Sequence, residues 1–419
     1  MFRHFIFFWG ITLVLCALFT PAPAVAGENE NDTRLALRID RVLQQAVSSQ
    51  RIVGAVVIVL ENGKTVFHQA AGYADREAGI PMRKDHIFRF ASLSKPIVTV
   101  ALLRLVEAGK LSLNDPVTRY IPDFKPKLRD GSMPCITLHQ LLTHTAGLSS
   151  DFAKQSVRIT SEPGSSKITA EEEELNRIRA AGLAYIPGKG WGYSLAIDVL
   201  GVVLKQATGM SLEDAVRQWG TLPAGMRDTG FYPIDPARLT TPYGDGTPPV
   251  RMGEPHIVRF GENNGIVFSP GRILNRSMSS LAGSGMSGTA SDMAHLLEVI
   301  RTGGGNLLPP AVAQSLMTNH TGTFYVLAGP GWGFGYGGAV LRDPERAKTP
   351  QSAGTWSWGG VWGHSWFVDP EQKLVVVALT NTALEGVSGR FPLEIRDAVY
   401  GRSTPLPQKP MMQDSCQSE

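Results

Sequence analysis

The sequence predicts an α+β fold, in which an antiparallel sheet formed by both chain ends is flanked by helices and accompanied by a mostly helical lobe. Two observations predict it. Short β-rich apolar runs gather near the N-terminus and in the last third, whereas the middle carries apolar residues at helical spacing. The simplest architecture pairs the terminal strands in one sheet and places a cleft where the two lobes meet.

The opening segment reads as a helix followed by a strand pair. Residues 35–47 have amphipathic helical spacing. Residues 52–60 and 65–70 are β-rich runs, and between them lie Asn62 and Gly63. Because Asn-Gly between two such runs is the strongest short-range hairpin signal, we expect an antiparallel pair here.

The middle of the chain reads as a series of helices with recognisable ends. Residues 93–107 have helical spacing, and Gly109 is a suitable stop. Thr137-Leu-His-Gln has the form of a capping box, which opens a helix expected to end near Gly147. Thr169-Ala-Glu-Glu repeats that signature before a charged helix. The polar segment 150–167 before it is expected to be a surface loop.

Two more helices are expected before a long irregular stretch. Residues 195–206 form a strongly apolar segment, with Ser194 as its expected cap and Gly209 as its end, and Ser211 caps the next helix. Residues 231–282 are rich in Pro, Gly and Arg and show little periodicity, whereas 292–301 return to a helical pattern.

The last third is β-like. Residues 340–341, 365–368 and 374–379 are apolar runs, and Asp-Pro-Glu-Gln at 369–372 predicts a hairpin turn between the last two. Beyond Arg402 the chain is polar and Pro-bearing. We therefore expect one domain over residues 27–402, with a sheet lobe from about 35–90 and 290–400, a helical lobe at about 92–289, and a flexible tail over 403–419.

Composition is that of an ordinary soluble enzyme, since 43% of the 419 residues are hydrophobic and 18% are charged. The formal charge of +3 is small for this length, and no Lys/Arg-rich run stands out. A nucleic-acid partner is therefore not expected.

The N-terminus has the order of a secretory signal peptide. A short basic start at Arg3 precedes an apolar run over residues 5–19 and an Ala-Val-Ala cleavage site at 24–26. We expect cleavage after Ala26, and hence a periplasmic or secreted protein with no stable membrane span. The alternative is an uncleaved anchor, for which the apolar run is short.

Of the three cysteines, Cys16 lies in the signal segment. A disulfide between Cys135 and Cys416 is permitted in an exported protein but not required. The simpler expectation is two unpaired thiols, with Cys135 buried.

The strongest chemical signal is Phe-Ala-Ser-Leu-Ser-Lys-Pro at residues 90–96. Ser92 and Lys95 are three apart, which places both side chains on one face at the start of a helix. A serine hydroxyl needs a base, and a lysine amine can serve when its pKa falls from about 10.4 through burial or nearby positive charge. The alternative is a capping serine and a surface lysine, because Ser-x-x-Lys alone occurs by chance.

Two Gly-rich segments add candidates. Tyr193 follows Pro-Gly-Lys-Gly-Trp-Gly and leads into a helix, where its side chain can enter a cleft or simply pack. Trp358-Gly-Gly-Val-Trp-Gly-His leads into the final strands, and its glycines permit close approach to a ligand. A backbone amide there could be an oxyanion donor; the alternative is a tight turn with aromatic packing.

Competing motifs are missing from the sequence. It contains no Gly-x-Ser-x-Gly nucleophile elbow, no His-Glu-x-x-His and no Gly-x-x-x-x-Gly-Lys-Ser/Thr loop. The nine histidines are scattered, which disfavours a zinc hydrolase. His144, in Leu-Leu-Thr-His-Thr-Ala-Gly-Leu, is interpreted as a structural, hydrogen-bonded histidine rather than a partner of a serine.

Taken together, the segments resemble the serine β-lactamase and penicillin-binding-protein superfamily in its class C-like branch. The resemblance covers about residues 35–400 and rests on five stretches in order: Phe-Arg-Phe-Ala-Ser-Leu-Ser-Lys-Pro, Gly-Lys-Leu-Ser-Leu-Asn-Asp-Pro-Val, Leu-Leu-Thr-His-Thr-Ala-Gly-Leu, Pro-Gly-Lys-Gly-Trp-Gly-Tyr-Ser-Leu and Gly-Met-Ser-Gly-Thr-Ala-Ser-Asp-Met-Ala.

The resemblance implies a β-lactamase/transpeptidase-like fold and a role for each matching residue. Ser92 would be the acylated nucleophile and Lys95 its general-base partner. Tyr193 would share protons with both and return one to the leaving group. The backbone amides of Ser92 and Val361 would be the oxyanion donors. No cofactor or metal is implied.

Two departures from the family pattern indicate the substrate. Where the family has Tyr-x-Asn, this chain has Tyr-Ser-Leu, ending at Leu195; where it has Lys-Thr-Gly, this chain has Trp358-Gly359-Gly360. A leucine and a tryptophan offer apolar surface instead of groups that grip an amide and a carboxylate. These versions look like family VIII carboxylesterases, which implies a serine hydrolase for short uncharged esters.

Two alternatives stay open. One is a β-lactamase or a D-alanyl or other D-amino-acid peptidase whose carboxylate recognition lies elsewhere, which would take a small amide in place of an ester. The other is a non-catalytic binder of cell-wall fragments, against which the presence of Ser92, Lys95 and Tyr193 together argues.

Overall fold

The computed structural model describes residues 30–148, 170–259, 265–276, 278 and 280–404. The expected signal segment, the polar segment 150–167, and Cys416 with the distal tail lie outside these residues. The central sheet is antiparallel, with strand order β10-β11-β12-β13-β14-β1-β2-β3. Its strands are β1 (Gly54–Glu61), β2 (Lys64–Asp75), β3 (Ile80–Pro81), β10 (Trp332–Phe334), β11 (Ala339–Leu341), β12 (Trp356–Gly360), β13 (His364–Asp369) and β14 (Leu374–Thr380).

The two chain ends meet at the middle of this sheet. Strand β1 pairs with β14 from Ala55 opposite Thr380 to Glu61 opposite Leu374, and β1 also pairs with β2. Asn62 and Gly63 between β1 and β2 have φ of 51° and 80°, the left-handed values that a tight hairpin turn needs. The predicted α+β fold, with its sheet drawn from both ends, is confirmed.

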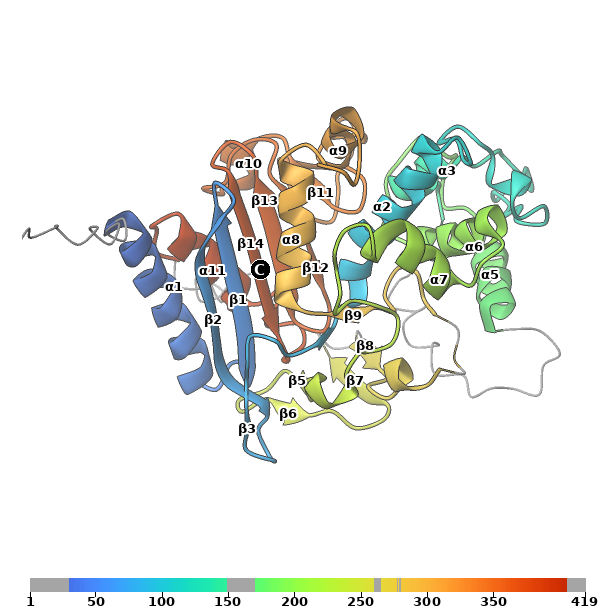
Figure 1. The fold of residues 1–419 in the computed structure, drawn as a ribbon. Coiled ribbons are helices and arrows are strands. Elements are labelled where there is room, and N and C mark those ends of the chain that lie inside the picture. Colours follow the sequence, from blue (N-terminus) through green and yellow to red (C-terminus); the bar gives the residue numbers. More distant parts are fainter. Residues whose placement is uncertain (1–29, 149–169, 260–264, 277, 279, 405–419) are drawn as a thin grey trace, which may run out of the picture.

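Helices cover both faces of the sheet, as Figure 1 shows. Helices α1 (Glu30–Ser48) and α11 (Arg390–Val399) cover one face, and α8 (Ala290–Arg301) covers the other. Alternation along β1 explains the two cores: Val57 and Val59 pack with α1 and α11, whereas Val56 and Ile58 share a core with α8. The sheet is therefore buried on both sides.

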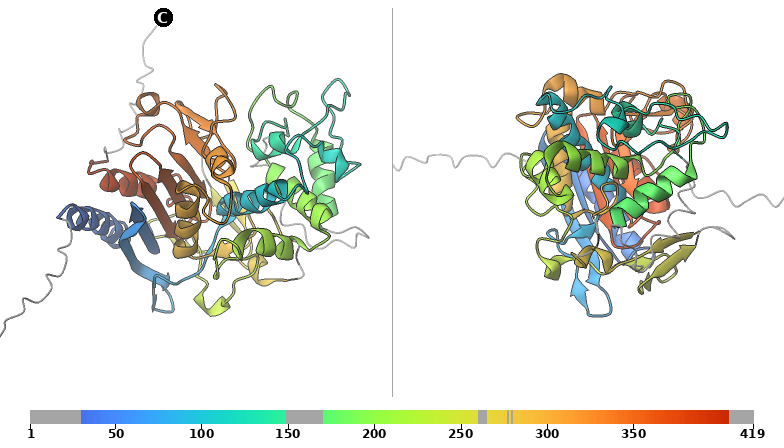
Figure 2. Two further views of the ribbon diagram at one scale, coloured as in Figure 1. Left: turned by 45° about the horizontal axis from the view of Figure 1, so that its top comes forward. Right: turned by 90° about the vertical axis from the view of Figure 1, so that its right-hand side faces the viewer.

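The helical lobe lies beyond α8 and contributes to the same core (Figure 2). Its helices are α2 (Ser94–Glu107), α3 (Leu138–Leu142), α5 (Ala170–Ala181), α6 (Ala196–Thr208) and α7 (Leu212–Val216). Helix α6 ends at Gly209 with φ 68°, and Ser211 caps α7, as expected. Two shorter helices, α9 (Pro310–Leu316) and α10 (Pro344–Ala347), belong to the sheet lobe.

Two predicted helix boundaries were wrong. The capping box of Thr137 and Gln140 is present, but α3 ends at Leu142 and not near Gly147. The cause is His144, whose φ of 56° turns the backbone out of the helical path. Ser194 does not cap α6, because the cap residue is Leu195 and the Ser194 hydroxyl lies against His144 instead.

The stretch 231–282, in which little structure was expected, contains short strand pairs. They are β5 (Tyr243–Gly244) with β6 (Val250–Arg251), and β7 (His256–Arg259) with β8 (Gly265–Phe268). The additional pair of β4 (Phe88–Arg89) and β9 (Ser287–Gly288) lies between the lobes.

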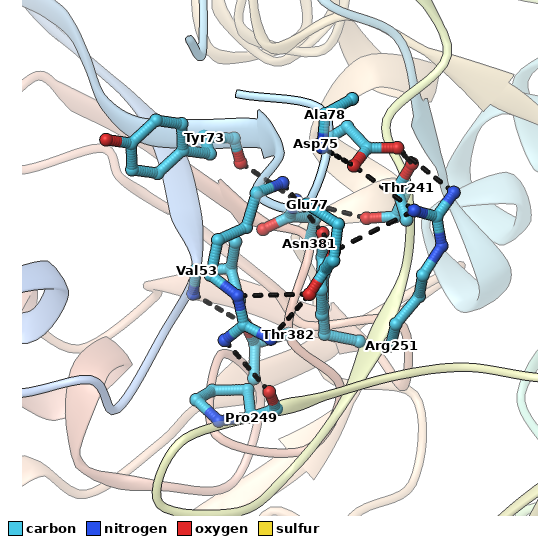
Figure 3. A network of polar contacts seen from close by, with 12 residues as sticks. Val53, Tyr73, Asp75, Glu77, Ala78, Thr241, Pro249, Arg251, Asn381 and Thr382 are labelled. Carbon is cyan, nitrogen blue, oxygen red and sulfur yellow. Dashed lines mark hydrogen bonds and ion pairs between the residues drawn. The ribbon is translucent and has the colours of Figure 1, made fainter. Parts of the chain in front are cut away.

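Polar contacts tie the stretch 231–282 to the end of the sheet (Figure 3). The Asn381 amide donates to the carbonyls of Tyr73 and Thr241, and its oxygen accepts the amide of Gly54. The Thr241 hydroxyl donates to Asp75 at 2.7 Å. Because Asn381 bridges three segments, it fixes how the irregular stretch sits beside the strands.

Cys135 is exposed, so the expectation of a buried thiol was wrong. Its neighbour Ile136 is the buried residue, and in an extended segment successive side chains point to opposite sides. Within the described ranges, no helix has both the length and the apolar character to cross a bilayer.

Candidate active site

Ser92 is presented on a strained turn between two elements. Strand β4 pairs with β9, and the Phe90 amide donates to the Met286 carbonyl at 2.8 Å. A single 3₁₀ turn, η1 (Ala91–Leu93), then leads into α2. Ala91 has φ 46°, which is rare for a residue with a side chain. The residue before Ser92 is thus held in a strained conformation of the kind found at functional sites.

The three predicted catalytic side chains meet at the Ser92 hydroxyl. Lys95 Nζ lies 3.1 Å from Ser92 Oγ, and the Tyr193 hydroxyl donates to the same oxygen at 2.8 Å. Both Ser92 and Lys95 are buried, at 7% and 3% exposure. Residues 101 positions apart are therefore brought within hydrogen-bond reach of one nucleophile.

Lys95 is held in place by more than the serine. Its Nζ donates to the Gly283 carbonyl at 2.8 Å and lies 4.9 Å from the centre of the Tyr193 ring. These contacts point the amine at Ser92 and fix its orientation. The spacing of Ser92 and Lys95 across the η1–α2 junction produces the alignment that the sequence predicts.

Trp358 lies over the tyrosine that faces the serine. Its indole Nε1 donates to the Tyr193 hydroxyl at 3.3 Å, and the two ring centres are 5.2 Å apart. Phe334 packs edge-on against Trp358, and Trp191 packs on Phe334. Tyr193 therefore sits in an aromatic cluster with its hydroxyl directed at Ser92.

His144 belongs to this cluster without bonding the nucleophile. Its Nδ1 accepts the Ser194 amide at 3.3 Å, and its ring centre is 4.8 Å from that of Tyr193. Burial, and then the charge of Lys95, lowers the pKa of His144 well below its usual value. A neutral imidazole that supports Tyr193 fits the structural role expected from the sequence.

The segment carrying the expected oxyanion donor borders the same pocket. Trp358 and Gly359 of β12, and Val361 directly after it, line the pocket with Ser92. Gly360 passes η1 so closely that a Cβ would lie 2.4 Å from the Phe90 carbonyl oxygen. Only glycine allows this approach of β12 to the turn that carries Ser92. The role of the Ser92 and Val361 amides stays a prediction.

Unlike Trp358, Gly359 and Val361, and like Gly360, Leu195 does not line the pocket at Ser92. It is the cap residue of α6 and packs, partly buried, against the main core, outside the set of side chains that line the pocket at Ser92. Its substrate-binding role stays a prediction.

The pocket at Ser92 measures about 1000 Å³, and its wall is mainly apolar and aromatic, although polar residues and Arg396, which is paired with Asp397, also line it. Trp191, Tyr193 and Trp358 line its inner part, and Tyr325 and Leu327, exposed at 72% and 66%, stand at its rim. A second cavity of about 170 Å³ adjoins it. Ile266 and Val361 line both cavities.

His364 supports the site from the sheet. Its Nε2 lies 2.6 Å from the carbonyl oxygen of Arg89, so this nitrogen must carry the proton and donate. Burial lowers the pKa of His364 to about 4, which keeps the imidazole neutral near pH 7. This bond joins β13 to β4 shortly before Ser92.

Neither a cofactor nor a metal was expected from the sequence. In the part of the chain that the structure describes, no three His, Cys, Asp or Glu side chains are grouped to hold a metal ion. What the arrangement can do is transfer protons around one buried hydroxyl beside an apolar pocket.

Sequence reasoning missed three residues that lie next to the site: Gly283, Phe334 and Asp198, whose carboxylate accepts the Gly283 amide. Gly283 acts through its backbone carbonyl, 188 positions from Lys95, and no side-chain motif could reveal that. Phe334 lies in β10, a short strand that was not predicted. Asp198 had a weak signal, since it is an acidic residue within an otherwise apolar helix.

Comparisons with known proteins agree with this geometry. Residues 39–398 match the Beta-lactamase family. Esterase EstB of Burkholderia gladioli is 47% identical over 376 residues, which span 88% of this chain and 96% of that protein.

Solved structures share the fold. The structure of EstCE1, a hydrolase with promiscuous acyltransferase activity, has a TM-score of 0.82 and 43% identity, covering 89% of this chain and all of that one. The octameric penicillin-binding protein homologue of Pyrococcus abyssi has a TM-score of 0.65 at 20% identity, covering 87% of this chain and 76% of the other, and shares the fold alone.

Proposed function

The chain belongs to the Beta-lactamase family, and we propose that it is a serine carboxylesterase that works through an acyl-enzyme on Ser92. The observation that carries the proposal is the pair of hydrogen bonds at one buried oxygen. Ser92 Oγ is contacted by Lys95 Nζ at 3.1 Å and by the Tyr193 hydroxyl at 2.8 Å. The 47% identity with esterase EstB of Burkholderia gladioli supports the same activity.

The proposed reaction has two halves. Ser92 Oγ attacks the ester carbonyl carbon while its proton passes to the Lys95–Tyr193 pair. Tyr193 then returns a proton to the departing alkoxide, so that an alcohol leaves and the acyl group stays on Ser92. In the second half, water attacks the acyl carbon and its proton passes to the same pair. The pair then gives a proton to Ser92 Oγ as the bond between this oxygen and the acyl carbon breaks, and the carboxylic acid leaves.

The surroundings of Ser92 favour an uncharged ester. A carboxylate that enters an apolar pocket loses its water, and that costs several kcal/mol unless a charged partner replaces it. At the position of the family's lysine the chain has Trp358, whose indole nitrogen donates to Tyr193. A neutral acyl chain has no such cost and gains about 0.8 kcal/mol for each buried CH₂.

Covalent labelling tests the nucleophile. A fluorescent alkyl phosphonate should label the wild type, and Ser92→Ala should lose both labelling and ester turnover, by several orders of magnitude in kcat. Ser94→Ala is the matched control, because Ser94 is fully buried and its hydroxyl accepts the Met286 amide. Labelling that persists in Ser92→Ala and disappears in Ser94→Ala would contradict the assignment.

We also propose that the enzyme is exported and works in the periplasm or outside the cell. The support is the sequence of residues 1–26, with its basic start, apolar run and Ala-Val-Ala site. In an exporting host the mature N-terminus should be Gly27, which terminal sequencing measures. A mature fraction that keeps Met1 would refute the proposal.

A further inference from the structure

The acidic side chain of Asp198 lies close to Lys95, and the reaction proposed above gives it no role. Asp198 is in the first turn of α6, five residues after Tyr193. Its Oδ1 accepts the Gly283 amide at 3.0 Å. The carbonyl of the same Gly283 accepts from Lys95 Nζ at 2.8 Å. One residue of the chain therefore joins Asp198 to Lys95 through its two backbone polar groups.

The side chains of Asp198 and Lys95 occupy the space beside the Gly283 Cα. A Cβ built on Gly283 would lie 2.8 Å from Asp198 Oδ2 and 3.3 Å from Lys95 Nζ. The lysine and the carboxylate thus bind the two peptide groups on either side of the Gly283 Cα, with no room for a larger residue between them. The position requires glycine because of this crowding, since its φ is not left-handed.

The charges around Asp198 come from several elements. Lys95 on α2 and Arg272 in η5 (Arg272–Leu274) both act on the carboxylate, and the first turn of α6 also favours a negative charge. Lys95 also lies over the Tyr193 ring, and its charge acts on the neutral His144. Burial raises the pKa of Asp198 above its usual range, although Lys95, the Gly283 amide and Arg272 oppose that shift.

We propose that Asp198 is a positioning residue for this hydrolysis, a role that rests on the proposed function of Ser92. Its hydrogen bond to the Gly283 amide holds the backbone of this residue so that the Gly283 carbonyl, in the next peptide group, fixes Lys95 against the nucleophile. Its carboxylate also lies close enough to Lys95 for the two charges to interact, so Asp198 contributes to the electrostatic surroundings of the amine.

The substitution Asp198→Asn separates the two effects, because it keeps an oxygen acceptor for the Gly283 amide and removes the charge. Loss of the carboxylate removes its charge interaction with Lys95, so the acidic limb of the kcat/KM profile for nitrophenyl butyrate should move to lower pH. The value of kcat at the optimum should stay within about threefold. Asp198→Ala should show the same displacement and a further loss of about tenfold, since the hydrogen bond also goes.

The matched control is Asp292→Asn. Asp292 occupies the same third position in the first turn of α8, accepts the Asp228 amide at 2.8 Å, and also has a pKa raised by burial. Its carboxylate accepts from Asp228 and Thr229 and not from the Gly283 backbone that holds Lys95, so its profile should overlay that of the wild type. Gly283→Ala disturbs the backbone residue that joins Asp198 to Lys95 and leaves Asp198 itself unchanged. Its kcat should fall at least tenfold with little change in KM.

The outcomes are distinct. An unshifted acidic limb in an active Asp198→Asn enzyme, or full activity in Gly283→Ala, would overturn the role of Asp198 and leave the esterase intact. A wild type without ester turnover would overturn the proposed function, and the inference with it. If Asp198→Asn lowers the thermal midpoint far more than Asp292→Asn and cannot be assayed, Gly283→Ala decides the question.

Discussion

Among individual residues, the sequence predicts the side chains of the site better than their surroundings. Ser92, Lys95 and Tyr193 were singled out from short motifs, and the structure brings them to one oxygen. The backbone groups that hold them were not predictable. The Gly283 carbonyl is an example, because every residue has a carbonyl and only the fold decides which one meets Lys95.

At this residue scale, the central expectation is that Lys95 and Tyr193 act as one proton-sharing unit. Both contact Ser92 Oγ, and Lys95 Nζ lies 4.9 Å from the Tyr193 ring centre. Lys95→Ala and Tyr193→Phe should each reduce kcat/KM about 10³-fold, and the double variant should lose little more than the worse single variant. Steady-state kinetics of the three variants at one pH measures the coupling. If the two single losses multiply, the residues act independently.

At the scale of the element, β12 is a glycine-rich strand that the sequence did not clearly predict. Trp356–Gly360 forms β12, although its Trp-Gly-Gly sequence was also compatible with a tight turn. Glycine contributes no side chain to the two-residue period from which strands are predicted, and the strand forms because β11 and β13 pair with it on both sides. Helix α11 was missed for a similar reason, since Pro392 interrupts its pattern in the first turn.

The close approach of β12 to η1 gives a prediction about this element. In Gly360→Ala the added Cβ would lie 2.4 Å from the Phe90 carbonyl oxygen, so β12 must move away from the turn that carries Ser92. Displacing a predicted oxyanion donor should lower kcat about 100-fold, with a smaller effect on KM.

Gly253→Ala is the control for that variant. Gly253 has no left-handed φ, and the nearest atom to its Cβ would be the Pro255 oxygen at 3.9 Å. It should keep full activity. A Gly360→Ala enzyme with wild-type kcat would show that the spacing of β12 and η1 has no part in catalysis.

At the scale of the whole molecule, the predicted architecture is confirmed because its signals are global. The apolar runs at both chain ends predict a joint sheet, and β1 lies beside β14. Substrate preference is also a property of the assembled cleft. The pocket wall combines Trp191 from the helical lobe with Trp332 and Trp358 from the sheet, so its full extent depends on the fold and not on any one segment.

The ratio of ester to β-lactam turnover tests the central claim most directly. The wild type should be assayed with nitrophenyl butyrate and with nitrocefin, under the same conditions, with Ser92→Ala as the blank. Because an unpaired carboxylate costs several kcal/mol to desolvate and 1.4 kcal/mol is tenfold, kcat/KM should be at least about 100-fold higher for the ester. A wild-type kcat/KM for nitrocefin equal to or above that for nitrophenyl butyrate would contradict the assignment as an esterase.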